Sequence, residues 1–509
     1  MQGFFRALGV AAALLGATAQ AQDYWIDPAF NGGQYSVDAF SGGGTANYRA
    51  KTLAHLASGD VVVAGVVPRR DGTGNALGIV RYNAAGVRQT WANPGAFGQF
   101  SNQYVIYDPA GPLPRPIDDV KNIVAFGDRL FVLVESQAYG FNAMIPPQVR
   151  FRGYAVDVVV FGIDGAYLGS EEVHIGENAD ARDAFGGGIA LYSNLLLPET
   201  ISLVYGGTLI ANGMRRATFR RYTVTNGALA AQTSIVYPNP GNACAGQQQC
   251  DVVGIALGGR SGAGGSPRIY LGGSHYGENW DFMAMRLDAN GVPVAAFGGT
   301  GMHGVAFNIA NSDAHDSGRA IVVEPGGFLG SNTDEIYVGG DVASNCADGV
   351  GIAKLRATGE PDTTFGPGGL GLVRYGDTYT APGTLCFAGT PTRYAHALAL
   401  ADGKLALVGQ TNRASLLIGG ETSVDAFFSV VDATTGYVGD YAEFPYPPAG
   451  QRQRHSGLWG VVGAGAGAFA AAGDVRFFAS TGAGMAGKMQ FATARFAPRP
   501  DLIFANGFQ

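Results

Sequence analysis

A small residue followed by an apolar residue opens a predicted strand seven times along this chain of 509 residues, at intervals of 63–77 residues. Runs of alternating apolar and polar residues follow each start, and they are rich in β-branched and aromatic residues, which is typical of short strands. A long internal period of this kind predicts an array of equivalent units rather than unrelated domains. The apolar members of the column are Leu53, Ile123, Ile189, Ile255, Ile321, Leu398 and Val461.

The fifth unit shows the strand pattern most clearly. It predicts strands over 317–324, 335–340, 350–356 and 370–375, with a glycine-rich turn before the last. A second column lies near the end of the second strand, and glycine there indicates the close approach of another backbone. Its members are Gly65, Val134, Gly206, Gly272, Gly339, Gly409 and Gly473.

The seventh unit lacks a fourth strand, because its third strand at 489–496 is followed only by a short tail. The N-terminal region holds a spare strand, GQYSVDAF at 33–40, directly after DPAF, and DPAF resembles DTTF at 362–365. Pairing of this strand into the last unit would leave no exposed sheet edge at the seam. We therefore predict an all-β fold, a seven-bladed β-propeller with four strands per blade and a ring closed by the N-terminal strand.

The predicted propeller spans 22–497. Its blades are expected near 48–108, 118–175, 184–237, 251–308, 317–375, 394–444 and 457–496, the last completed by 33–40.

Three segments resemble a known repeat: GIVRYNAAGVRQTW, FMAMRLDANGVPVAAFG and GIAKLRATGEPDTTFGPGG. They look like the delta-60 repeat, and ADGKLALVGQ at 401–410 is similar to the strand that precedes it in that family. The resemblance covers almost all of the mature chain, although the second and third units depart from the pattern. It implies a propeller fold and export, because the family is common in large secreted or surface proteins of bacteria. It implies no catalytic residues.

The first 21 residues predict a secretory leader. Arg6 precedes an apolar run at 7–17, and Ala19-Gln20-Ala21 is a small-x-small cleavage site. The run is too short to span a bilayer, and no other segment has enough consecutive apolar residues to do so. We expect an exported monomer located outside the cell, at the cell surface or in the periplasm. The tail at 498–509 contains DLIFANGF, which resembles a C-terminal motif of exported Gram-negative proteins or is a remnant of the repeat.

The net charge and the cysteine content limit the kinds of partner that we expect for this chain. A net charge of −7 on this length gives no electrostatic footprint for nucleic acid or an anionic membrane. Four cysteines in an exported chain favour disulfides, with Cys244–Cys250 and Cys346–Cys386 as the natural pairings among three possible connectivities. Zinc is the rival interpretation, but no histidine lies at ligand spacing from a cysteine. We expect no metal and no cofactor.

Candidate binding residues fall on one end of the ring. Loops after second strands and between blades are long, for example at 135–152, and long loops on a rigid scaffold commonly carry recognition. Tyr276 and Trp280 could stack on a sugar ring or simply pack on the blade below. Polar residues stand ahead of the innermost strands, where they either bind a polar ligand or form the wet rim of a channel: Arg49, Asp118, Asp119, Asp183, Asp251, His315, Asp316, Arg393, Tyr394, Arg454 and His455.

Motifs of common enzymes are missing, including GxSxG, HExxH and the P-loop. We therefore favour a non-catalytic propeller that recognises a polysaccharide or a protein at the cell surface, with no catalytic residues assigned. One alternative is a hydrolase or lyase that uses carboxylates and histidine at the channel mouth, with His315 and Asp316 as the densest cluster. The other is a purely structural exported module.

Overall fold

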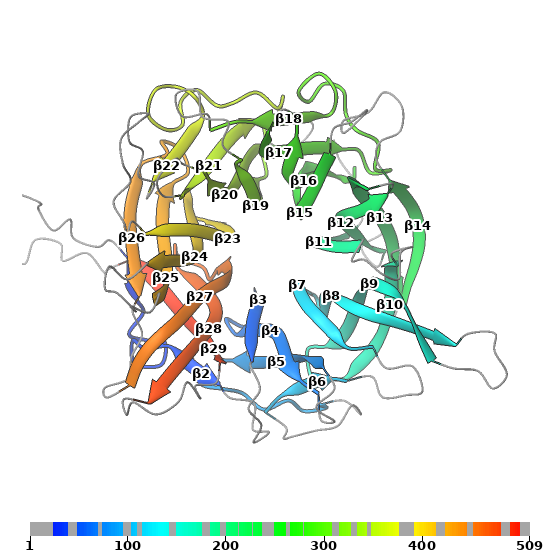
Figure 1. Cartoon of the computed structure of the whole chain (residues 1–509), viewed down its shortest axis with the longest axis vertical. Coiled ribbons are helices and arrows are strands. Elements are labelled where there is room, and N and C mark those ends of the chain that lie inside the picture. Colours follow the sequence, from blue (N-terminus) through cyan, green and yellow to red (C-terminus); the bar gives the residue numbers. More distant parts are fainter. Residues whose placement is uncertain are drawn as a thin grey trace, which may run out of the picture.

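The computed structural model describes residues 24–38, 48–69, 74–94, 103–108, 115–141, 149–175, 184–193, 200–211, 213–225, 228–236, 249–260, 265–277, 279–307, 315–326, 333–343, 348–375, 391–413, 423–444, 451–479 and 489–498. Every regular element within these ranges is a β-strand. Seven blades of antiparallel strands surround one axis (Figure 1), which confirms the predicted seven-bladed β-propeller. No helix in these ranges is long and apolar enough to cross a membrane.

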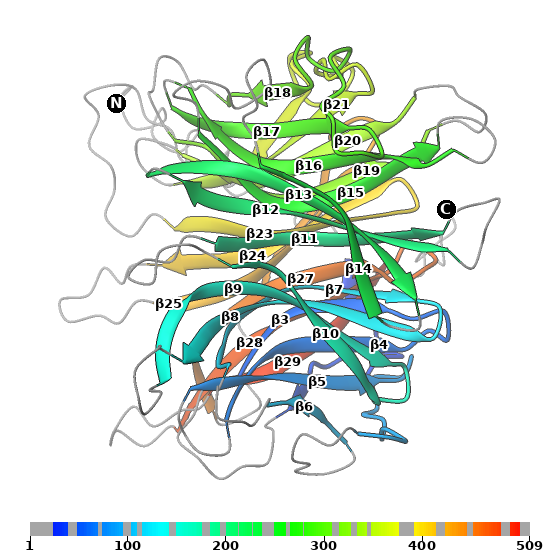
Figure 2. The same ribbon diagram turned by 90° about the vertical axis from the view of Figure 1, so that its right-hand side faces the viewer.

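In each blade the chain begins at the innermost strand and moves outward (Figures 1 and 2). The first blade comprises β3 (Arg49–His55), β4 (Val61–Pro68), β5 (Asn75–Tyr82) and β6 (Val105–Tyr107). The second comprises β7 (Ile117–Phe126), β8 (Arg129–Phe141), β9 (Val149–Gly162) and β10 (Tyr167–Ile175). The third comprises β11 (Ala184–Ser193), β12 (Ile201–Ala211), β13 (Met214–Thr225) and β14 (Ala228–Val236).

The remaining blades follow the same order. The fourth comprises β15 (Gln249–Arg260), β16 (Pro267–Tyr276), β17 (Trp280–Leu287) and β18 (Met302–Val305). The fifth comprises β19 (Ser317–Glu324), β20 (Glu335–Val342), β21 (Gly349–Arg356) and β22 (Leu372–Tyr375). The sixth comprises β23 (Thr392–Ala401), β24 (Lys404–Arg413), β25 (Ser423–Asp432) and β26 (Val438–Phe444). The seventh comprises β27 (Gln451–Gly463), β28 (Phe469–Ala479) and β29 (Met489–Pro498), completed by β1 (Tyr24–Ile26) and β2 (Ser36–Asp38).

The hydrophobic core is divided among the interfaces between blades. Seven clusters of buried side chains each join two neighbouring blades. The apolar column predicted from the sequence supplies one residue of each innermost strand, and Leu53 and Ile189 are only 2% and 3% exposed. Burial of these side chains between blades is what the repeat period encodes, because one blade alone cannot cover its own faces.

A β-bulge interrupts every innermost strand two residues before the apolar column, which leaves one extra residue unpaired. This bulge explains the glycine column and corrects it by one position in three blades. The strand register places Gly207, Gly273 and Gly340, not Gly206, Gly272 and Gly339, opposite the bulge. The sequence has two adjacent glycines in each of these units, so the pattern could not choose between them.

Glycine occupies the position opposite the bulge in six blades, where the first strand turns a carbonyl toward it, and Val134 takes this position in the second blade. A Cβ on Gly273 would lie 1.9 Å from the carbonyl oxygen of Asp251. We expect Gly273→Ala to lower the free energy of unfolding by about 1–3 kcal/mol, since backbone must move to admit the methyl group. Gly277→Ala is the matched control, because its Cβ would meet only His275 at 3.7 Å. Equal denaturation midpoints for the two variants would contradict this explanation.

Neighbouring blades are also joined by hydrogen bonds from a repeated position. In four blades the side chain of the residue after the corrected glycine column accepts a hydrogen bond from an amide of the next innermost strand. Glu135 accepts from Gly186 at 2.7 Å, and Thr208 accepts from Val252 at 2.7 Å. Ser274 and Asp341 repeat the contact at 2.9 and 2.6 Å, to Gly318 and Ala395. Each bond gives a side-chain partner to the amide of the residue directly before the bulge.

The seam of the ring lies in the seventh blade, as predicted. β2 pairs with the middle of β29, from Ser36 opposite Thr493 to Asp38 opposite Phe491. β1, which was not predicted, pairs with the end of the same strand. Phe30 between them is fully buried, and the following Asn31 amide donates to the Ala85 carbonyl of the first blade at 2.8 Å.

The same joint recurs between blades that are continuous in sequence. Gly298 follows the buried Phe297 and donates to the Thr358 carbonyl at 2.8 Å, and Gly366 follows Phe365 and donates to the Thr435 carbonyl at 2.9 Å. The N-terminal DPAF element therefore occupies the place that DTTF occupies in the fifth blade.

The predicted loop at 135–152 is mostly strand. β8 and β9 continue as a hairpin from Glu135 opposite Val156 to Phe141 opposite Val149, with one register shift between Ala138 and Tyr139. The sequence expectation was wrong here because the hairpin projects beyond the body of the blade (Figure 1), where its residues need no regular apolar alternation.

Candidate functional site

The predicted site residues lie at the starts of the innermost strands, and therefore at one end of the ring. Asp251 and Tyr394 belong to β15 and β23, and Asp316 directly precedes β19. Arg454 and His455 lie in β27, but their side chains, like all of Asp183, fall outside the described residues. The residues form separate contacts around the ring rather than one constellation.

One group of them does gather, on the fourth blade. The rings of Tyr276 and Trp280 lie 5.5 Å apart at 55°, across the β16–β17 hairpin. Arg215 of the third blade forms an ion pair with Asp251 and lies with its guanidinium carbon 5.9 Å from the Trp280 ring. The Trp280 amide donates to Nδ1 of His315 at 3.3 Å. This patch is partly exposed and offers an aromatic edge beside a charge pair that is already satisfied.

The other predicted residues do not gather into one site, and most of them contact only residues close to them. Asp118 accepts a hydrogen bond from Gln137 at 2.8 Å. Asp119 lies between Lys121 and Lys51, at 2.9 and 3.5 Å, and these cations hold its pKa below the usual range despite burial. Arg49 is exposed at the start of β3. Arg393 and Tyr394 begin β23, where Arg393 donates to the Tyr441 hydroxyl at 2.6 Å and burial raises the pKa of Tyr394.

Asp316 and His315 do not form an acid–base pair. Asp316 is 2% exposed, and its two carboxylate oxygens accept the amides of Phe307 and Ala343 at 2.9 and 3.0 Å. Burial raises the pKa of Asp316 to about 6. His315 is exposed and bonds the Trp280 backbone instead. Asp316, directly before β19, therefore holds the segment after β18 and the segment after β20 in place, which is the structural role expected of a polar residue before a strand.

Five of the seven bulged positions carry cationic or aromatic side chains, a feature that sequence analysis missed. Trp459 stacks on His396 with ring centroids 3.9 Å apart, and Lys51 Nζ lies 4.2 Å from the Trp459 ring. Burial, together with Arg319 and Lys51, lowers the pKa of His396 to about 3, so the imidazole is neutral at neutral pH.

The cations of this ring are compensated by carboxylates. Asp119 lies 3.5 Å from Lys51 and 2.9 Å from Lys121, and Glu135 lies 3.5 Å from Lys121. Asp341 accepts a hydrogen bond from Arg319 at 2.8 Å, so three carboxylates face three cations. The ring is thus a neutral network that connects blades across the axis-facing strands, and it offers no excess charge to a ligand.

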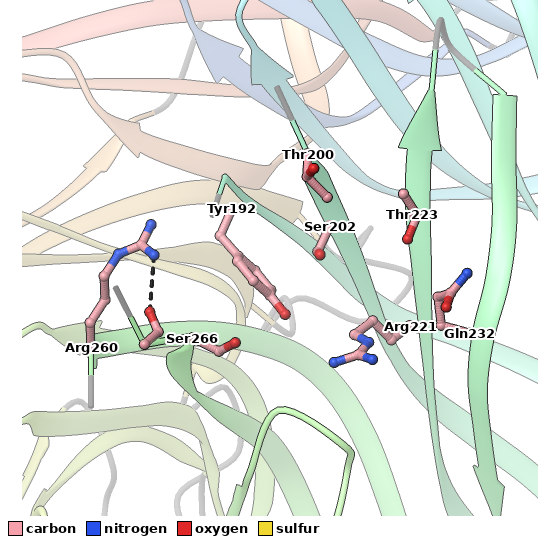
Figure 3. Close-up of a pocket in the computed structure, with 9 residues that line it drawn as sticks. Tyr192, Thr200, Ser202, Arg221, Thr223, Gln232, Arg260 and Ser266 are labelled. Atoms are coloured by element: carbon pink, nitrogen blue, oxygen red, sulfur yellow. Dashed lines mark hydrogen bonds between the residues drawn. The ribbon is translucent and has the colours of Figure 1, made fainter. Parts of the chain in front are cut away.

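A polar pocket opens at the other end of the ring, between the third and fourth blades (Figure 3). It forms where β11 and β15 end and β12 begins, so it lies on the face opposite the predicted residues, none of which lines it. The cavity measures about 200 Å³. Its lining residues are Tyr192, Thr200, Ser202, Arg221, Thr223, Gln232, Arg260, Gly265 and Ser266.

Both arginines of the pocket reach across the interface to backbone carbonyls of the facing blade. Arg221 of β13 donates to the Ala289 carbonyl at 2.8 Å. Arg260 at the end of β15 donates to the Ser193 carbonyl at 2.7 Å and to that of Gly265 at 3.1 Å. These bonds orient the guanidinium groups, and the lining residues include no carboxylate. The pocket is therefore polar and positively charged.

Only one of the four cysteines, Cys250, lies within the described residues. Cys250 is buried in β15 and belongs to a disulfide. Cys244, Cys346 and Cys386 lie outside the described residues, so the two pairings stay predictions.

The similarity of this chain to known proteins is distant. No family model matches the chain, and no curated protein matches it. The β-propeller domain of the Trilobed protease from Pyrococcus furiosus is 8% identical, with 86% of this chain and 94% of that chain covered and a TM-score of 0.35. Sqt1 from Chaetomium thermophilum is 13% identical, with coverages of 89% and 87% and a TM-score of 0.36.

A sialidase from Trypanosoma rangeli is also similar, at 9% identity and a TM-score of 0.29, and the match covers 88% of this chain but only 55% of that one. Likeness at this level carries no argument about activity. The resemblance to the delta-60 repeat remains a prediction from the sequence.

Proposed function

We propose that this protein is an exported, non-catalytic recognition propeller that binds a polysaccharide in the pocket between the third and fourth blades. The observation that carries the proposal is the lining of that pocket. It combines hydroxyl, amide and guanidinium groups with the ring of Tyr192, and the lining residues within the described ranges include no carboxylate.

Such a lining suits a sugar. Ser202, Thr223 and Gln232 offer both donors and acceptors for sugar hydroxyls, and a tyrosine offers apolar area together with a polar tip. Pockets that bind small ligands usually place a few polar groups on rigid elements. Here Ser202 and Thr223 lie on paired neighbouring strands, β12 and β13. Export rests on the predicted leader at residues 1–21, which lies outside the described residues.

The hydrolase alternative finds less support. Glycoside hydrolysis uses two carboxyl groups that flank the scissile bond. The part of the pocket lining that the structure describes has no carboxyl group, and the carboxylate of Asp316 accepts hydrogen bonds from two backbone amides.

A glycan array probed with residues 22–509 tests the proposal. We expect saturable binding that weakens about tenfold to a hundredfold in the double variant Thr223→Val, Gln232→Leu, because two hydrogen bonds of about 1 kcal/mol or more are lost without a change of shape. The double variant Tyr276→Ala, Trp280→Ala alters the opposite face and should bind normally.

Loss of binding in the Tyr276→Ala, Trp280→Ala variant, with normal binding in the Thr223→Val, Gln232→Leu variant, would place the site at Tyr276 and Trp280 on the fourth blade. Capture of an envelope protein without any glycan signal would favour a protein ligand. No binding in either assay would contradict the recognition role and favour a structural module.

A further inference from the structure

Arg221 and Arg260 have no ion-pair partner among the residues that the structure describes. Their described hydrogen bonds go to carbonyl oxygens, which use N–H groups but do not cancel the charge. Neighbouring arginines behave differently. Arg215, on the same strand as Arg221, pairs with Asp251, and Arg268 pairs with Asp334.

The two charges lie in one pocket. Figure 3 shows the Tyr192 side chain between the two guanidinium groups, with Ser202 and Thr223 on the strands beside it. Each guanidinium has five N–H donors, and the carbonyl contacts described here use one on Arg221 and two on Arg260. The remaining donors are held on a rigid frame, because each arginine is anchored to the facing blade. A chain of net charge −7 thus carries a local excess of positive charge in its polar pocket.

We infer that the pocket binds a carboxylated sugar, so that the ligand is an acidic polysaccharide rather than a neutral one. This inference rests on the proposed function and deepens it. Guanidinium groups match carboxylate geometry, and charge-assisted hydrogen bonds are about twice as strong as neutral ones. The hydroxyl and amide groups of Ser202, Thr223 and Gln232 serve the uncharged part of the same ring. A sulfated or phosphorylated sugar shares the anionic chemistry, and the experiment separates these sources.

The test is calorimetric titration of residues 22–509 with polygalacturonate and with its fully methyl-esterified form, which keeps the sugar and removes the charge. We expect the acid to bind at least tenfold more tightly than the ester, with an affinity that falls as salt rises. Arg221→Gln and Arg260→Gln should each weaken binding of the acid about tenfold to a hundredfold. Dextran sulfate of similar length is the second anionic probe.

Arg129→Gln is the matched control. It removes one positive charge from the second blade, where Arg129 lies 3.6 Å from Asp128, and it should leave affinity unchanged. An equal loss in this control would show a general charge effect and overturn the inference. Unchanged thermal unfolding midpoints for the two pocket variants confirm that they remain folded.

The outcomes separate the two proposals. Equal binding of acid and ester would overturn the inference and leave the polysaccharide function standing. Tighter binding of dextran sulfate than of polygalacturonate would overturn the choice of carboxylate. Binding of free galacturonate through both arginines, without binding of any polymer, would support the anion site and contradict the polysaccharide function. No binding of any probe would overturn both.

Discussion

Replacement of Asp334 by asparagine is expected to lower the free energy of unfolding by about 3–5 kcal/mol, the largest loss that we predict for a single polar residue. Asp334 is 1% exposed and joins the fourth blade to the fifth. Its Oδ2 accepts Arg268 Nε at 2.5 Å and the Tyr270 hydroxyl at 2.8 Å. Its Oδ1 accepts the Gly259 and Gly326 amides, each at 2.9 Å. Asparagine would remove the carboxylate that forms an ion pair with the buried Arg268 and would set an amide group against its donors.

Two controls show whether the buried charge is the cause. Asp128→Asn removes a carboxylate that is 84% exposed and 3.6 Å from Arg129, and we expect a change below about 1 kcal/mol. The double variant Arg268→Met, Asp334→Asn should recover part of the loss, because it removes the stranded cation. Strictly additive effects in denaturant titrations would contradict this account.

The Asp334 contribution also depends on pH. Hydrogen bonds from Arg268, Tyr270 and two backbone amides hold the pKa of Asp334 below its ordinary value of 3.8, although burial opposes them. A carboxyl group with a lowered pKa in the folded state contributes stability above its unfolded pKa and loses it as the pH falls through the folded value. The difference between wild type and Asp334→Asn should therefore be constant near neutral pH and shrink below about pH 4.

The second large effect is expected for Phe30→Ala, at about 3–5 kcal/mol. Phe30 is fully buried, and a Cβ on Gly86 of the first blade would lie only 2.9 Å from its ring. Its removal leaves a cavity where the turn between β1 and β2 rests on that blade. Ser36, whose hydroxyl donates to the Gly86 carbonyl at 2.8 Å, is part of the same joint.

Phe365→Ala is the matched control, because Phe365 is fully buried at the equivalent joint of the fifth blade. The two variants should lose similar free energy in denaturant titrations. Hydrogen exchange should distinguish the two variants. Phe30→Ala should expose the amides of β29 to exchange, because the outer partners of β29 are β1 and β2, which flank Phe30. Phe365→Ala should leave the protection of β29 unchanged. Equal protection of β29 in both variants would show that Phe30 does not secure the seam.

The fold could be predicted from the sequence because each blade repeats one buried residue at one place. The spacing of Leu53 and its equivalents predicted the contacts between blades. The spare strand at 33–40 predicted how the ring closes in the seventh blade. The exact strand pairing could not be predicted where the sequence pattern fitted two neighbouring positions equally well, and very short strands could not be predicted at all. The paired glycines at 272–273 could not be ordered without the bulge, and β1 has too few residues to produce a periodic signal.

The pocket could not be predicted, for a different physical reason. Arg221 and Arg260 are 39 positions apart and lie on different blades, so their approach is a property of the ring. Whether an arginine has a carboxylate partner also depends on three-dimensional neighbours. The one available signal was the unusual density of arginine in the third blade, where MRRATFRRYTVT contains four.

The seam has a consequence for how the protein is made. β1 and β2 are synthesised first, but their partner β29 ends at Pro498, hundreds of residues later. The two parts of the seventh blade are therefore synthesised far apart in time. The ring cannot close until β29 has left the ribosome. A chain that stops before β29 keeps unpaired strand edges on both sides of the gap, and such edges promote aggregation. The ring can therefore close only in a chain that contains both the N-terminal strands and β29.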